Sequence, residues 1–120
     1  MSERSAVAQA VSLYFEGINS SNTAIIPLAD DVVYTGPMVP GPITGEEAVR
    51  RHIAEISPFV ARLDQKLTII EDDNAAVILE FEGVNGVVIE GVEFFRVRNG
   101  KICLNQTFFD TRPLLEGTKE

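Results

Sequence analysis

Residues 75–111 read AAVILEFEGVNGVVIEGVEFFRVRNGKICLNQTFFDT, and this stretch decides the fold. Polar and apolar residues alternate in parts of it, such as Glu80-Phe81-Glu82 and Phe95-Arg96-Val97-Arg98, which is typical of β-strands with one buried face. Asn99-Gly100 is a strong signal for a tight hairpin, and Asn85-Gly86 marks a second turn. The stretch therefore predicts three consecutive antiparallel strands, over residues 75–82, 87–98 and 101–111.

Helical patterns dominate the N-terminal part of the chain. Apolar residues recur at helical spacing from Ser5 to Ile18, which predicts an amphipathic helix. A short second helix is expected over residues 23–29, although Pro27 near its middle argues against it. A short strand is expected over residues 31–35.

A proline- and glycine-rich loop over residues 36–45 separates this part from a third helix. Thr44 and Glu47 form a capping-box pattern, so the helix is expected to begin at Gly45 and to end at Pro58. One more strand is expected over residues 60–71. Helices followed by a meander of long strands predict the α+β class, with a curved antiparallel sheet covered by helices on one face.

The composition limits the possible functions. The 120 residues are enough for one domain over residues 1–120. The sequence contains one cysteine, Cys103, and one histidine, His52. This excludes an internal disulfide, a cysteine-based zinc cluster and a multi-histidine metal site. The net charge of −8 argues against nucleic acid and anionic membrane as partners. The sequence has no signal peptide and no apolar run long enough to span a membrane, so a cytoplasmic location is expected.

Carboxylates recur on the predicted strands. Glu80 and Glu82 share one face of their strand, opposite Leu79 and Phe81. On an outward face the two would be solvated charges. On a face turned toward the helices, at least one would be protonated or paired.

Two further acids have two interpretations each. Glu93 shares a face with Phe95, which makes it a candidate for a raised pKa, or it lies at a sheet edge and reaches water. Asp110 shares a face with Gln106 and Phe108, or it is a turn residue at the end of the strand.

Three side chains on other elements join these acids. Tyr14 falls in the apolar arc of the first helix, Tyr34 lies on the first strand, and His52 lies at the margin of the apolar face of the third helix. Each alone is more often structural than catalytic. A core filled only for stability would not collect so many polar groups, so the sequence predicts a deep pocket.

Four segments resemble the nuclear-transport-factor-2-like fold, the group that includes SnoaL-like polyketide cyclases, ketosteroid isomerases and limonene epoxide hydrolase. The segments are LADDVVYTGP (residues 28–37), TGEEAVRRHI (44–53), RVRNGKI (96–102) and QTFFD (106–110). The resemblance covers nearly the whole chain. It implies a cystatin-like α+β barrel, in which a cone-shaped antiparallel or mixed sheet wraps around about three N-terminal helices.

The similarity to ketosteroid isomerases implies an oxyanion hole. Their helix-1 tyrosine matches Tyr14, and their protonated acid matches Glu93. Their aspartate base falls on Gly36, so this chain lacks the proton-abstracting group of that design.

The similarity to limonene epoxide hydrolase implies a different set of catalytic residues. Its tyrosine matches Tyr34 and its terminal aspartate matches Asp110. Its arginine and second acid fall on Glu80 and Glu82, and its asparagine falls on Gly36. This match predicts that Glu80 and Glu82 point into the cone. SnoaL-like cyclases also place an acid–base aspartate near the last strand, which again indicates Asp110.

Together these features predict cofactor-free acid–base catalysis, of isomerase, cyclase or epoxide-hydrolase type, on a small and mainly apolar molecule. Asp110 is the expected base, Glu82 or Glu93 the acid with Glu80 nearby, and Tyr14 or Tyr34 the hydrogen-bond donor. The expected substrate-binding residues are His52, Phe95, Phe108, Gln106 and Met38. No metal or organic cofactor is expected.

A non-catalytic ligand-binding or dimerisation module is the alternative, because Gly36 and Glu80 break both catalytic patterns. A homodimer is expected in either case. Its interface would be the outer face of the sheet, with Phe94, Arg96 and Arg98.

Overall fold

The computed structural model describes residues 3–117. The helices are α1 (Glu3–Asn19), α2 (Glu46–Ile56) and α3 (Arg112–Gly117), with single 3-10 turns η1 (Thr23–Ile25) and η2 (Ser57–Phe59). The strands are β1 (Leu28–Thr35), β2 (Ile43–Thr44), β3 (Val60–Glu71), β4 (Asn74–Gly83), β5 (Val88–Arg98) and β6 (Lys101–Phe109).

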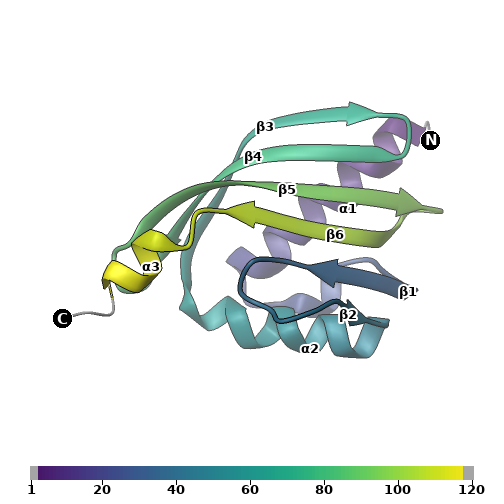
Figure 1. Ribbon diagram of the computed structural model, residues 1–120. Helices are drawn as coiled ribbons and strands as arrows, with labels where there is room; N and C mark the ends of the chain where they lie inside the picture. Colours follow the sequence, from purple (N-terminus) through teal and green to yellow (C-terminus); the bar gives the residue numbers. More distant parts are fainter. Residues whose placement is uncertain (1–2, 118–120) are drawn as a thin grey trace.

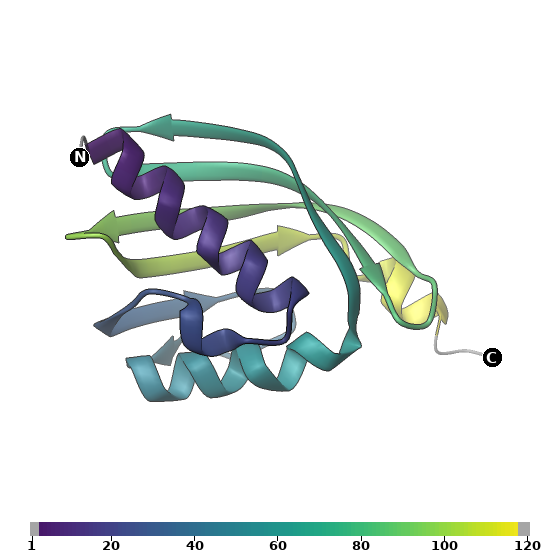
Figure 2. The ribbon, with the colours of Figure 1, turned by 180° about the vertical axis from the view of Figure 1, so that it is seen from behind.

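The strands form one sheet in the order β2-β1-β6-β5-β4-β3 (Figure 1). β3 to β6 are an antiparallel meander, as expected, and β1 joins β6 in parallel, so the sheet is mixed. The long strands curve, with α1 running across their inner face and α2 lying beside β1 (Figure 2). This confirms the α+β architecture. No helix within residues 3–117 is both long and apolar enough to span a membrane.

The inner face of the sheet and α1 share the core. Val77 and Phe95 on the sheet and Val11 on α1 are completely buried. The ring of Tyr14 packs edge-on against Phe95, with centroids 4.9 Å apart. Aromatic pairs in this arrangement add a geometric preference to area burial. Tyr14 is therefore held at a defined position on the inner face of the sheet.

Two local predictions for the helices are wrong. The segment expected as a second helix is only the turn η1, because Pro27 cannot donate a backbone hydrogen bond inside a helix, and β1 begins directly after it. The expected capping box is absent: Thr44 belongs to β2, and no side chain caps α2. Gly45 instead makes the turn into α2 with a φ of 101°, a conformation that glycine adopts without strain.

A β-bulge decides which residues of β6 face inward. Arg96 pairs with Leu104, but the next residue of β5, Val97, pairs with Ile102, so no residue of β5 lies opposite Cys103 in the strand pairing. One extra residue reverses the alternation of side chains along the strand. Ile102 and Asn105 are therefore both buried, although residues three positions apart on a regular strand would point to opposite faces.

Candidate functional site

A cavity of about 410 Å³ lies between the inner face of the sheet and the helices. Its walls are mostly apolar, with contributions from α1, α2, β1, β3 to β6 and α3. Of the side chains that the structure describes, six polar ones reach it: Tyr14, Tyr34, His52, Glu55, Glu93 and Thr107. Few, convergent polar groups on an apolar wall are typical of a small-molecule site.

Glu93 is the buried carboxyl of this cavity. Alternation along β5 places it on the inner face with Phe95, and it is 5% exposed. Three hydrogen bonds converge on it: Oε2 accepts from the Tyr14 hydroxyl at 3.2 Å, and Oε1 accepts from Asn105 Nδ2 at 2.7 Å and from Thr107 Oγ1 at 3.0 Å.

The environment of Glu93 changes its acidity. Burial raises its pKa from 4.5 to about 7, because the charged form loses hydration. The hydrogen bonds from Asn105, Thr107 and Tyr14 oppose this rise, since they stabilise the carboxylate. Glu93 therefore exchanges a proton near neutral pH, where it can act as a base or as an acid.

The two tyrosines stay protonated over the same range. Burial and, secondarily, the charge of Glu93 hold the pKa of Tyr14 well above its usual value. Burial also raises the pKa of Tyr34, although its hydrogen bond with Thr107 opposes the rise. Both phenols are consequently available as neutral hydrogen-bond donors.

Tyr34 extends the polar group around Glu93 toward α2. Its hydroxyl lies 3.1 Å from Thr107 Oγ1, which in turn donates to Glu93. The imidazole of His52 lies against the Tyr34 ring, with centroids 4.9 Å apart. His52 Nε2 is buried and has no hydrogen-bond partner in the described part of the chain, and burial lowers the His52 pKa against the opposing influence of Glu55. A neutral imidazole is thus available to a ligand.

Gly36 makes room for Tyr34. A Cβ at this position would lie 2.9 Å from the Tyr34 hydroxyl and 3.5 Å from Thr107 Cβ, and the first distance is too short for a real contact. Gly36 is the position that matches the aspartate base of ketosteroid isomerases and the asparagine of limonene epoxide hydrolase. In this chain its missing side chain leaves space for the Tyr34 phenol.

Five of the residues expected at the site line the cavity. They are Tyr14, Tyr34, Met38, His52 and Glu93. In the residues that the structure describes, no three His, Cys, Asp or Glu side chains are grouped so that they could hold a metal ion.

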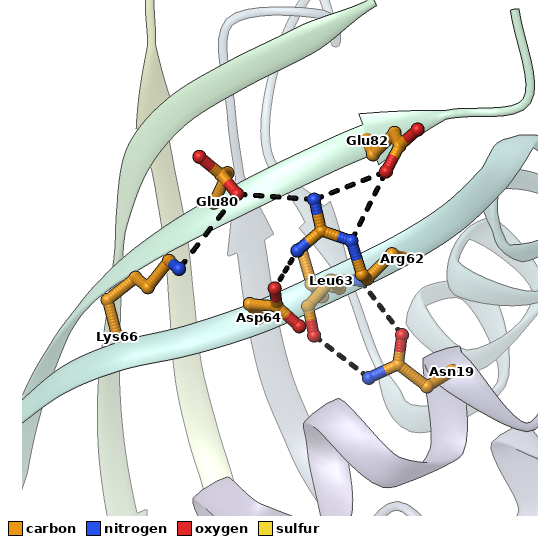
Figure 3. A network of polar contacts seen from close by, with 7 residues as sticks. All are labelled: Asn19, Arg62, Leu63, Asp64, Lys66, Glu80 and Glu82. Carbon is orange, nitrogen blue, oxygen red and sulfur yellow. Dashed lines mark hydrogen bonds and ion pairs between the residues drawn. The ribbon is translucent and has the colours of Figure 1, made fainter. Parts of the chain in front are cut away.

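The prediction that Glu80 and Glu82 point into the cone is wrong. Both lie on the outer face of β4, where the guanidinium of Arg62 bridges them (Figure 3). Arg62 also pairs with Asp64, and Lys66 lies 3.9 Å from Glu80. Alternation along β4 gives the inner face to Val77, Leu79 and Phe81, and β3 supplies the compensating cations, so neither acid is a free solvated charge.

Asp110 also lies outside the cavity lining. It follows the end of β6, where Oδ1 accepts a hydrogen bond from the backbone N–H of Arg112 at 3.0 Å, and its carboxylate pairs with the Arg112 guanidinium. That hydrogen-bonded guanidinium lowers the Asp110 pKa. The interpretation of Asp110 as a turn residue is correct, and its expected place in the pocket is wrong.

Three residues expected to bind substrate are elsewhere. Phe95 is completely buried in the core, behind Tyr14. Gln106 and Phe108 lie on the outer face, and Phe108 is 54% exposed. The bulge at Cys103 explains both outward positions, because the alternation that would turn them inward is reversed there.

The same bulge brings in two residues that sequence reasoning missed. Asn105 and Thr107 turn inward beside Glu93. The sequence did contain a signal for Asn105. Asn105 and Gln106 are adjacent polar residues of one strand, so one of them has to be on the buried face. Alternation alone cannot show which of the two faces is buried.

Comparisons with known proteins agree with this fold. The chain matches the SnoaL-like domain family over residues 11–105. Among proteins with curated descriptions, none matches the sequence.

Several solved structures are similar. An epoxide hydrolase from M. tuberculosis of the limonene-epoxide-hydrolase-like type has a TM-score of 0.84 at 16% identity, with 97% of this chain and 91% of that chain covered. A Jannaschia sp. CCS1 protein assigned to the SnoaL-like polyketide cyclases has a TM-score of 0.84 at 12% identity, with 98% and 94% covered. TerC, co-crystallised with polyporic acid, has a TM-score of 0.82 at 19% identity, with 96% and 99% covered. At these identities the likeness extends to the fold alone, and the match over residues 11–105 places this chain in the SnoaL-like domain family.

Proposed function

We propose that this protein moves a proton on a small, mainly apolar molecule that carries a carbonyl or enol oxygen, without a cofactor. The reaction would be of isomerase or cyclase type. The observation that carries the proposal is Glu93, a buried carboxyl with a pKa of about 7 beside the Tyr14 hydroxyl on the wall of an apolar cavity.

Glu93 would supply both halves of the proton transfer. As a carboxylate it can remove a proton from a carbon next to a carbonyl, and as the acid it can return that proton elsewhere on the same molecule. Its pKa near the working pH keeps both forms populated. Glu93 thus takes the role of base that was expected of Asp110.

Tyr14 would stabilise the charge that forms on the ligand. While Glu93 is ionised, the Tyr14 hydroxyl donates to Oε2. When Oε2 takes up the ligand proton, that hydroxyl becomes free to donate to the developing enolate oxygen. A donor already in place for developing charge is a strong contributor to catalysis.

The walls of the cavity favour a hydrophobic ligand. Ile53, Leu79, Phe81 and Ile89 line it, so most of a ligand would meet apolar surface. TerC, the relative co-crystallised with polyporic acid, supports the idea that this fold accommodates an organic ligand of this kind. The epoxide-hydrolase type receives less support, because Asp110, Glu80 and Glu82 do not meet in the cavity.

Hydrogen–deuterium exchange tests the proposal without knowledge of the natural substrate. 2-Tetralone, a bicyclic ketone with acidic α-hydrogens, serves as the probe in D₂O, and NMR measures the rate of exchange. We expect the protein to accelerate exchange and Glu93→Gln to lower the protein-dependent rate by about 10²–10⁴-fold. Glu82→Gln, on the outer face, is the matched control and should leave the rate unchanged.

The alternative is a non-catalytic ligand-binding module. One observation favours it: among residues 3–114, whose side chains the structure describes, Glu93 and Glu55 are the only carboxyls that line the cavity, so a second buried acid is missing there. If 2-tetralone raises the melting temperature but its hydrogens exchange no faster than in buffer, the binding interpretation replaces the catalytic one.

A further inference from the structure

We infer that Asn105 is a positioning residue for Glu93: with Thr107 it occupies Oε1, so that proton exchange takes place at Oε2. The inference rests on the proposed function in taking Glu93 as the proton-transfer group. It adds the atom at which the transfer occurs and the residue that selects this atom.

The two oxygens of the Glu93 carboxyl have different surroundings. Oε1 accepts from Asn105 Nδ2 at 2.7 Å and from Thr107 Oγ1 at 3.0 Å. These two donors use both lone-pair directions of a carboxylate oxygen. Among the described residues, Oε2 accepts only from the Tyr14 hydroxyl, at 3.2 Å, which leaves it one open direction.

One of the two donors at Oε1, the amide of Asn105, cannot reverse its role. The amide nitrogen of Asn105 only donates, and Asn105 is 1% exposed, with Nδ2 also 3.5 Å from the carbonyl of Phe94. Rotating the amide would turn Oδ1, which is buried and has no partner among the residues that the structure describes, against the carboxylate. Thr107 donates to the carboxylate while its oxygen accepts from Tyr34, and with the bond to Tyr34 reversed it can instead accept from a protonated Oε1.

Protonation therefore has different costs at the two oxygens. A proton on Oε1 would make it the hydroxyl oxygen of the acid, a weaker acceptor than a carbonyl oxygen, and would weaken the hydrogen bond from the buried Asn105 Nδ2, which cannot accept in return. A proton on Oε2 costs no hydrogen bond, because the hydroxyl of Tyr14 can accept as well as donate. The neutral acid would keep Oε1 as its carbonyl oxygen and carry its hydrogen on Oε2, beside the Tyr14 phenol that lines the cavity.

Few other ionisable groups act on this choice. Tyr14 from α1 lowers the Glu93 pKa by its hydrogen bond, and the charge of Glu93 in turn raises the pKa of Tyr14 and of Tyr34 from β1. His52 and Glu55 from α2 line the same cavity, whereas the parts of β3 and β4 that line it contribute apolar side chains. Asn105 and Thr107 are thus the non-titrating polar contacts of Glu93, and their removal should affect only its ionised form strongly.

NMR titration of ¹³C-glutamate-labelled protein, without ligand, tests the inference. The Glu93 signal is identified by its loss in Glu93→Gln. We expect Asn105→Leu to raise the Glu93 titration midpoint by about one to two pH units, because a hydrogen bond to the charged form is lost. Thr107→Val should raise it in the same direction, and Thr107→Ser, which retains the hydroxyl, should restore the original value. Tyr14→Phe should shift it less, because Tyr14 can bond to either form.

Infrared spectroscopy of the neutral acid identifies the oxygen. Asn105→Leu should move the carbonyl stretch of Glu93 to higher frequency, since its carbonyl oxygen loses a donor, and Tyr14→Phe should leave the stretch nearly in place. The inference is overturned by an unchanged midpoint in folded Asn105→Leu, by equal midpoints in Thr107→Val and Thr107→Ser, or by a larger infrared shift in Tyr14→Phe.

The threonine pair keeps the test valid if Asn105→Leu does not fold. All of these measurements are made on the ligand-free protein. A protein that passes them but exchanges no hydrogens of 2-tetralone would contradict the proposed function and leave the assignment of Oε2 intact.

Discussion

The hydroxyl of Tyr14 lies 3.2 Å from Oε2 of Glu93 and joins α1 to β5 across 79 positions of sequence. The phenol is fixed by its edge-on contact with Phe95, two residues after Glu93 on the same face of β5. Core packing therefore positions the donor, and the donor approaches the carboxyl oxygen that keeps an open direction. Preorganisation of this kind makes a hydrogen bond useful in a transition state.

Tyr14→Phe tests the role of that donor. The substitution removes one oxygen and retains the ring that packs on Phe95. We expect the exchange rate of 2-tetralone hydrogens to fall by about 10²–10³-fold, because the developing enolate loses its hydrogen-bond donor. Circular dichroism serves as the control for folding. An unchanged rate in folded Tyr14→Phe would mean that the phenol does not contact the reacting oxygen.

Glu93 should make stability depend on pH in a specific direction. Its pKa is 4.5 ordinarily and about 7 in the folded protein, so the folded state keeps a proton that the unfolded chain has released. Below the lower value Glu93 has no pH-dependent effect. As the pH rises from the lower value to about 7 the free energy of unfolding falls, and above about 7 the full loss amounts to about 3 kcal/mol.

Glu93→Gln isolates this effect from the other carboxyls, because glutamine does not titrate. We expect the variant to gain stability relative to the original protein by about 3 kcal/mol between pH 4 and pH 8. Urea unfolding of both proteins across this range measures the difference. A constant difference would show that Glu93 titrates at its ordinary pKa in the folded state.

Gly36→Ala should disturb Tyr34. The added methyl group would lie 2.9 Å from the Tyr34 hydroxyl, so the ring has to move away from Thr107. We expect a loss of about 1–3 kcal/mol, typical of an overpacked site. Tyr34→Phe removes the closest atom, so the loss caused by Gly36→Ala should shrink in the double variant. Additive losses in the double-mutant cycle would contradict the contact.

The patterns that predicted the fold were strong and local. The alternation in residues 75–111 and the Asn99-Gly100 turn predicted the meander correctly, because hairpin signals depend on neighbouring residues. The parallel pairing of β1 with β6 involves residues about 70 positions apart and has no local signal. The resemblance to known families supplied that part of the architecture.

The site could be predicted only in part, for two physical reasons. Tyr14 and Glu93 were recognisable because a polar group amid apolar neighbours at the correct period stands out in helix and strand patterns. Asp110 was assigned to the pocket and Asn105 was missed because the bulge at Cys103 reverses the alternation along β6. Glu80 and Glu82 were misplaced because their partner, Arg62, lies on another strand.

Asp110→Asn tests the revised place of this residue. Asparagine retains an oxygen that can accept from the Arg112 N–H but loses the charge that pairs with the Arg112 side chain. We expect the variant to melt at a slightly lower temperature than the original protein, and this difference should become smaller in high salt. The exchange rate of 2-tetralone hydrogens should be unchanged. A large fall in rate with intact folding would return Asp110 to the site.

The last prediction concerns a row of apolar side chains across the outer face of the sheet. Leu67 pairs with Ile78, Ile78 with Val92, and Val92 with Phe108, so one row crosses β3 to β6. Leu67, Ile78 and Phe108 are 51%, 42% and 54% exposed. We expect a second copy of the chain to cover this row, because a continuous apolar strip on a sheet face favours symmetric association.

Phe108→Glu places a charge in this row and should convert the dimer to monomer, as measured by light scattering at tens of micromolar. Val84→Glu is the control: Val84 is 63% exposed but lies in the turn after β4, outside the row. Each copy carries a net charge of −8, so the original dimer should tighten as salt screens the repulsion between copies. The prediction fails if the original protein is monomeric at this concentration, or if Val84→Glu dissociates the dimer as completely as Phe108→Glu does.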